Sequence, residues 1–122
     1  MPAPMGALFD LEITERTEGE VRARVPVTDS LKQPLGLVHG GVFASIADAL
    51  AVGATEGALR ALSNQASFLR PVTGGAIHAT ARRRHKGRTT AVWEVDMTDD
   101  EGRLCALVRI TLAPVPAAGT RS

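Results

Sequence analysis

The sequence predicts an α+β fold in which an antiparallel sheet of about six strands packs on one long helix. Most of the chain alternates apolar and polar residues, as half-buried strands do, and turn-forming residues separate the alternating runs. One stretch, residues 40–59, is instead almost continuously apolar and rich in alanine. The 122 residues suit a single domain over 1–122, with 1–6 and 115–122 expected to be flexible termini.

Two strands are predicted before the helix. Residues 9–14 alternate apolar and polar side chains, as a strand with one buried face does, and residues 21–27 repeat the pattern. The Glu-Gly-Glu segment 18–20 between them has the composition of a hairpin turn. Proline and glycine interrupt residues 28–38, which therefore predict a loop.

Four strands are predicted after the helix, over residues 64–69, 77–84, 91–98 and 104–112. The acidic segment that ends in Gly102 joins the last two as a hairpin, because glycine suits the left-handed position of such a turn. Strands joined by tight turns run antiparallel, so most of this sheet is antiparallel.

The predicted helix, Gly40 to Leu59, carries Asp48 as the only ionisable side chain between His39 and Glu56. A helix without a charged face needs cover on both sides. The sheet covers one side, and in so short a chain a second copy of the protein is expected to cover the other. A carboxylate in that position is either held by structural hydrogen bonds or used in chemistry, and spacing alone leaves both interpretations open.

Composition narrows the function classes. A formal net charge of +1 argues against a general nucleic-acid binder, and strand alternation is expected to scatter the basic run 82–88 over two faces. The single Cys105 forms no disulfide within the chain and suits a buried small side chain. No signal-peptide pattern opens the sequence, and the most apolar stretch is too short to span a membrane, so the cytoplasm is the expected compartment.

The start of the helix is the candidate for chemistry. A helix N-terminus presents unpaired N–H groups and partial positive charge, and Gly40 and Gly41 leave room for a ligand atom to approach. Such a site binds a phosphate or polarises a carbonyl oxygen, although the pattern is neither a P-loop nor a dinucleotide fingerprint. Asp48 lies eight residues further on, about 12 Å along the axis. One reacting centre can therefore use both groups only if they come from two neighbouring helices.

The Gly-Leu-Val-His-Gly-Gly box at 36–41, followed by an acid at Asp48, resembles the hotdog-fold acyl-CoA thioesterases of the PaaI-like and 4-hydroxybenzoyl-CoA thioesterase group. The resemblance covers roughly residues 8–113. Further matching segments are 27–33, Asn64, 67–72 and 99–106.

The resemblance implies a hotdog fold, a homodimer that pairs into a homotetramer, and an acyl-CoA substrate. The Gly40 N–H would contact the thioester oxygen, the Gln33 side chain would assist at that carbonyl, and Asp48 of the neighbouring protomer would attack the thioester or activate water. His39 would shape the turn, and a general-base role for it is the lesser alternative. No metal or redox cofactor is expected, since coenzyme A is part of the substrate.

The resemblance also suggests contacts to substrate. Gly41 would line the site, and Asn64 and Ser67 are candidates to lie near the acyl group. The candidates for coenzyme A contact are Arg70, Arg88, Thr89 and Thr90.

Two departures from the 4-hydroxybenzoyl-CoA branch bear on the chemistry. Asp48 stands where that branch has glutamate, which leaves nucleophile and general base both open. Val52 replaces a threonine there, and Ser67 is one possible substitute for the lost hydroxyl. The expected function is hydrolysis of an acyl-CoA, with an aromatic acyl group favoured and with no nucleic-acid or membrane partner. The alternatives are a non-catalytic acyl-CoA-binding module and a hotdog enoyl-CoA hydratase or dehydratase.

Overall fold

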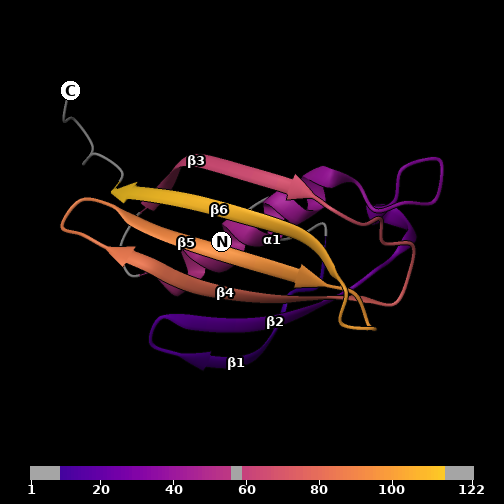
Figure 1. Cartoon of the computed structure of the whole chain (residues 1–122), viewed down its shortest axis with the longest axis horizontal. Coiled ribbons are helices and arrows are strands. Elements are labelled where there is room, and N and C mark those ends of the chain that lie inside the picture. The colour runs from indigo at the N-terminus through magenta and orange to yellow at the C-terminus, as the bar shows by residue number, and fades with distance from the viewer. Residues whose placement is uncertain (1–8, 56–58, 115–122) are drawn as a thin grey trace.

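A computed structural model describes residues 9–55 and 59–114 and shows one six-stranded antiparallel sheet with one α-helix against it (Figure 1). The strand order across the sheet is β1-β2-β4-β5-β6-β3, so β1 and β3 are the edges. The elements are β1 (Glu12–Thr17), β2 (Glu20–Pro26), a 3₁₀ turn (Asp29–Leu31), α1 (Gly40–Ala54), β3 (Leu59–Phe68), β4 (Ala76–Lys86), β5 (Ala91–Thr98) and β6 (Leu104–Pro114). The predicted fold class and element order are confirmed.

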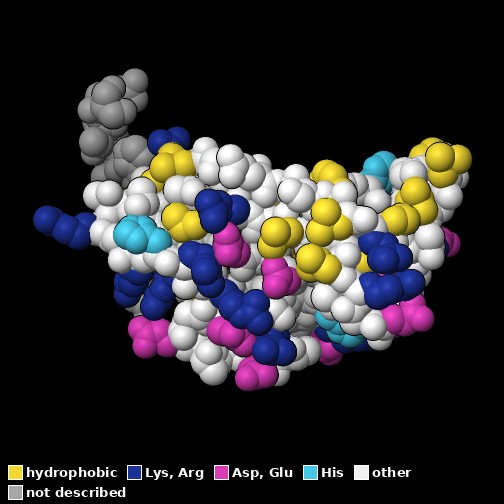
Figure 2. Space-filling model, in the orientation of Figure 1, with side chains coloured by type: hydrophobic (Ala, Val, Ile, Leu, Met, Phe, Trp, Pro, Cys, Tyr) yellow, Lys and Arg dark blue, Asp and Glu magenta, His cyan; other side chains and the backbone are white. Residues whose placement is uncertain are grey.

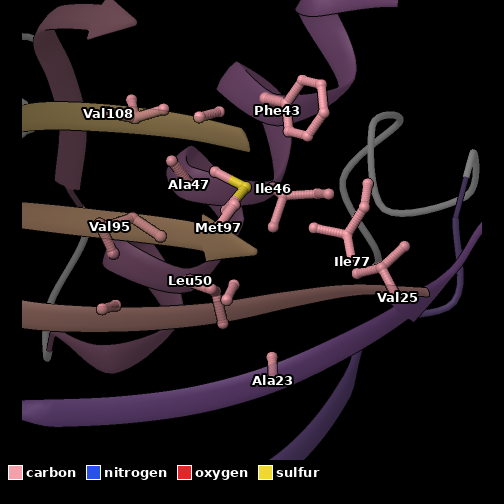
Figure 3. Packing of buried hydrophobic residues seen from close by; sticks show 14 of the residues in the cluster. Ala23, Val25, Phe43, Ile46, Ala47, Leu50, Ile77, Val95, Met97 and Val108 are labelled. Carbon is pink, nitrogen blue, oxygen red and sulfur yellow. The ribbon is translucent and has the colours of Figure 1, made fainter. Parts of the chain in front are cut away.

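The core lies between α1 and the inner face of the sheet (Figure 3). Ile46 and Leu50 of α1 are almost fully buried, and so are Val95, Met97 and Val108 of the facing strands. Buried alanines occupy the inner positions of β2 and β4. Cys105 is fully buried in the same layer, as predicted.

The helix ends at Ala54, five residues before the predicted end at Leu59. Thr55 is extended, with φ −112° and ψ 133°, and its hydroxyl donates to the Ala51 carbonyl oxygen at 2.8 Å. The indole N–H of Trp93 on β5 donates to the same hydroxyl at 3.2 Å. These two bonds tie the helix end to the sheet. Composition alone did not place this end, because residues 40–59 as a whole are mostly apolar and rich in alanine.

Replacing Thr55 by valine tests this helix end. The Trp93 side chain is 1% exposed, so loss of the hydroxyl leaves its N–H buried without an acceptor. We expect Thr55→Val to lower the free energy of unfolding by about 1–3 kcal/mol in a urea titration. The same substitution in a Trp93→Phe background removes both partners and should cost clearly less. Equal costs in the two backgrounds would show that the hydrogen bond contributes nothing.

The first strand differs from the prediction. It runs from Glu12 to Thr17 rather than over 9–14, and its residues are exposed. Phe9 is buried ahead of the strand, whereas Ile13 on it is 45% exposed. The reason is position: β1 is an edge strand that pairs only with β2, and α1 packs mainly against β3, β4, β5 and β6. The predicted flexible termini lie outside the described residues.

The outer face of the sheet carries paired charges, and Figure 2 shows basic and acidic side chains interspersed on it. Arg82 reaches Glu20 and Asp96 at 3.4 and 3.3 Å. Arg84 reaches Glu94, while Arg83 between them pairs with a different partner at the β1–β2 turn. The basic run is thus scattered as expected, and three of its arginines, Arg82, Arg83 and Arg84, are in ion pairs. Over residues 9–55 and 59–114, no helix is long and apolar enough to cross a membrane.

Candidate active site at the helix start

Short backbone hydrogen bonds hold the start of α1 against the segment that follows β3. The Val38 N–H donates to the Val72 carbonyl oxygen at 2.9 Å, and the His39 N–H donates to the Leu31 carbonyl oxygen at 3.0 Å. The preceding loop folds back because Gly36 adopts a φ of +88°, a conformation that favours glycine. The helix start and the end of β3 therefore share one site.

A cavity of about 360 Å³ opens at this point. Four of the residues predicted for the site, Gln33, His39, Gly40 and Arg70, line it together, although they come from a loop, a helix and the end of a strand. Two aromatic side chains, Phe43 and Phe68, complete the wall.

Gly40 is the first residue of α1, so its N–H has no acceptor inside the helix. His39 occupies the N-cap position, but its side chain makes no capping hydrogen bond. The ring of Phe68 lies so close that a Cβ on Gly40 would sit 2.9 Å from it, whereas a Cβ on Gly41 would meet nothing within 4 Å. A Cβ at position 40 would therefore require the exposed Phe68 ring to shift, whereas a Cβ at position 41 would meet open space.

Gln33 is oriented by its own loop. Its side-chain oxygen accepts a hydrogen bond from the Leu35 N–H at 2.6 Å, and its backbone N–H donates to the Leu37 carbonyl oxygen at 2.7 Å. With the oxygen engaged, the amide NH₂ is the end left to act as a donor. The cavity thus holds two kinds of hydrogen-bond donor, a helix N–H and a side-chain amide, and both suit a carbonyl oxygen.

Asp48 lies two turns along α1, half-buried on a helix face of small side chains. Burial raises the pKa of its carboxyl, and no ion pair or hydrogen bond among the described side chains opposes that shift. Asn64 on β3 donates to the Ala44 carbonyl oxygen at 3.1 Å. That carbonyl is the helical acceptor for the Asp48 N–H, so Asn64 lies beside the turn that carries Asp48. Within one chain, Asp48 lies about 12 Å along the axis from Gly40.

Ser67 lies away from this site. It pairs with Leu107 of β6, whose exposed side chain lies between the buried residues Ala106 and Val108, so Ser67 faces outward. Residues three apart on a regular strand point to opposite faces, so the sequence could have separated Ser67 from Asn64.

The proposed coenzyme A contacts Arg88, Thr89 and Thr90 form the turn between β4 and β5. Arg70 follows the C-terminal end of β3. Because β3 pairs with β6 and β6 pairs with β5, that end of β3 lies at the opposite end of the strands from the β4–β5 turn. An 11-residue strand such as β4 spans about 35 Å, so one chain does not bring these groups together.

Sequence reasoning missed the two aromatic walls. The rings of Phe43 and Phe68 have centroids 6.1 Å apart and planes at 44°, and Phe68 is 57% exposed. The available signal was that Phe68 shares a strand face with Asn64, four residues away. Among the described residues, no group of three or more His, Cys, Asp or Glu side chains could hold a metal ion.

Hydrogen-bond donors that line a cavity at a helix start suit the oxygen of an acyl carbonyl. The chain belongs to the thioesterase superfamily, whose family model matches residues 35–106. Both the hotdog fold and the thioester-hydrolase class implied by the sequence resemblance are thereby confirmed.

Individual relatives agree. The proofreading thioesterase EntH of Klebsiella pneumoniae is 32% identical over 93% of this chain and 84% of its own length. The 1,4-dihydroxy-2-naphthoyl-CoA hydrolase of Listeria monocytogenes is 32% identical over 84% of this chain and 89% of its own. Among solved structures, a hypothetical thioesterase protein of Streptococcus pneumoniae with coenzyme A aligns at a TM-score of 0.83 and 26% identity, covering 95% and 92% of the two chains.

Proposed function

We propose that this protein hydrolyses an aromatic acyl-CoA to the free acid and coenzyme A, without a resident metal or redox cofactor. The observation that carries the aromatic preference is the pair of phenyl rings, Phe43 and Phe68, beside Gly40 in the cavity. Aromatic side chains bind flat rings through stacked or edge-to-face contacts. The relative from Listeria, named for a naphthoyl-CoA substrate, supports the same class.

The donors at the helix start would bind the thioester oxygen. Negative charge develops on that oxygen as the carbonyl is attacked, and the Gly40 N–H and the positive end of the helix stabilise it. The side-chain NH₂ of Gln33, which lines the same cavity, would donate to the same oxygen. Asp48, whose pKa is raised by burial, would act as general base on the attacking water.

The active site would be shared between two copies of the chain. Gly40 and Asp48 are too far apart on one helix to meet a single carbonyl, and α1 leaves the face around Asp48 partly exposed. One side of the edge strand β3 pairs with β6 along its length, and no strand among the described residues pairs with its other side. Pairing of two β3 edges would cover that edge and bring two helices side by side. A homodimer, and a homotetramer built from it, is therefore part of the proposal.

The dimer would also bring the proposed coenzyme A contacts close to one another. Antiparallel pairing through β3 places the Arg88–Thr90 turn of one copy towards the Arg70 end of the other. Basic side chains there would hold the phosphates of coenzyme A. The S. pneumoniae structure with coenzyme A supports a ligand of this kind.

Release of free thiol from a panel of CoA esters tests the proposal. The panel runs from 4-hydroxybenzoyl-CoA and phenylacetyl-CoA to short and long straight-chain esters. We expect kcat/KM to be highest for the aryl esters, and Phe68→Ala to lower it for aryl esters more than for straight-chain ones. Bound esters without thiol release would favour the acyl-CoA-binding module. Hydration of an enoyl-CoA without thiol release would favour the hydratase.

A further inference from the structure

The exposed face of α1 carries one hydroxyl group near Asp48, that of Ser45. The two residues are three positions apart, which places them on the same helix face with Cβ atoms about 5–6 Å apart. Helical side chains lean towards the N-terminus, so the carboxylate of Asp48 extends over the turn that holds Ser45 and away from Val52. Both Ser45 and Asp48 are half-buried.

The proton of the Ser45 hydroxyl is already engaged. Its Oγ donates to the Gly41 carbonyl oxygen, one turn back, at 2.8 Å. A hydroxyl has one proton to donate and two lone pairs that accept, so Ser45 presents only acceptor capacity to its surroundings. An ionised Asp48 is also an acceptor only. Two such acceptors do not bond to each other, but both can accept from one water molecule, which has two O–H groups.

We propose that Ser45 is a water-positioning residue: the attacking water donates one hydrogen to Asp48 and the other to Ser45 Oγ. Its remaining lone pair then points away from the helix, towards the acyl carbon. This inference rests on the proposed function, since it needs Asp48 to act as general base. Its geometry lies on one helix and is independent of how two chains pair.

The step balances without another reactant. The water oxygen bonds to the acyl carbon as its first proton passes to Asp48. The C–S bond then breaks, its electron pair leaves on sulfur, and Asp48 returns the proton to the CoA thiolate. The second water hydrogen becomes the hydrogen of the product carboxyl group, and the Ser45 hydroxyl keeps its proton, which stays hydrogen-bonded to the Gly41 carbonyl oxygen throughout.

Three serine variants test the proposal by their steady-state kinetics. We expect Ser45→Ala to lower kcat by about 10- to 100-fold with little change in KM, because one hydrogen bond to the reacting water is lost. Ser45→Thr should retain most of the activity, since threonine in a helix also bonds the carbonyl one turn back. Ser30→Ala, at an exposed position of the 3₁₀ turn Asp29–Leu31, is the control and should match the wild type.

Partition between water and added methanol separates positioning from a structural effect. Methanol has a single O–H, which would donate its hydrogen bond to Asp48. Its methyl group would then face Ser45 Oγ without a hydrogen bond, so the wild type should disfavour attack by methanol. In Ser45→Ala that penalty disappears. We expect the ratio of methyl ester to free acid to rise about tenfold in Ser45→Ala and to stay unchanged in Ser45→Thr.

An unchanged product ratio in a folded Ser45→Ala enzyme would overturn the inference, even if kcat fell. Circular dichroism and thermal melts establish folding. If Asp48 is not the general base, the result is different, because Asp48→Asn itself then retains turnover. If Asp48→Asn is inactive while Ser45→Ala keeps both kcat and the product ratio, the base is correct and the water is held by another group.

Discussion

Asp48→Asn is expected to lower kcat by about 10²- to 10⁴-fold while substrate binding changes little. The substitution keeps the size and shape of the side chain but removes the group that takes the proton from water, and general-base catalysis is worth a factor of that order. The measurement is thiol release at saturating aryl-CoA, with binding of the same ester followed separately. Turnover equal to that of the wild type would remove Asp48 from the mechanism.

The same substitution should make the protein more stable at neutral pH. Burial raises the pKa of the Asp48 carboxyl in the folded chain. At pH values between the ordinary pKa of an aspartate and this raised pKa, the folded state binds more protons than the unfolded state. Stability therefore falls as pH rises from the ordinary pKa of an aspartate through the raised pKa, and the whole loss is present above the raised pKa. Asparagine carries no such cost. We expect the Tm of Asp48→Asn to exceed that of the wild type at pH 7 and the difference to shrink as the pH is lowered below the ordinary range for aspartate.

A pH profile gives an independent check. A general base works only when ionised, so kcat should rise with pH through the raised pKa of Asp48 and then level off. The midpoint should lie above the ordinary value for an aspartate. A profile without this acid limb, in an enzyme whose chemical step limits the rate, would argue against Asp48 as the base.

The sequence was sufficient for the order of elements because alternation and turn chemistry are local. Gly19 and Gly102, predicted in hairpin turns, do adopt positive φ values of 83° and 80°. The helix end was not predictable in this way. It depends on the hydrogen bonds that Trp93 and Thr55 make across 38 residues, whereas the local composition suits helix and strand equally.

The candidate site also combines residues that a local motif predicts with residues that only tertiary contacts bring to it. The box at 36–41 is a local motif, and Gln33, His39 and Gly40 do line one cavity. The strand face that Phe68 shares with Asn64 is a weak local signal, because the aromatic wall itself is a tertiary contact between a strand end and a helix start. Gly40 and Asp48 stay about 12 Å apart along one helix, as their spacing predicts, and only the proposed pairing of two chains would bring them together.

Gly40 allows the oxyanion donor itself to be removed. Proline is tolerated at the first position of a helix, and the preceding His39 already has the extended conformation that proline requires, with φ −60° and ψ 139°. Gly40→Pro therefore deletes the N–H while keeping the helix start. Gly40→Ala is the matched control, because it also places a Cβ against Phe68 but keeps the N–H. We expect kcat for Gly40→Pro to lie about 10²- to 10³-fold below that of Gly40→Ala. Equal kcat values would place the oxyanion elsewhere.

Mixing two inactive proteins decides whether the site is shared. In a dimer of one Asp48→Asn chain and one Gly40→Pro chain, a shared arrangement gives one site with both defects and one with neither. Co-expressed chains that pair at random form such mixed dimers half of the time, so about a quarter of wild-type activity should return. A site contained within one chain would stay inactive, because every chain carries a defect. Recovery in the mixture, absent when either variant is expressed alone, would establish that Gly40 of one copy works with Asp48 of the other.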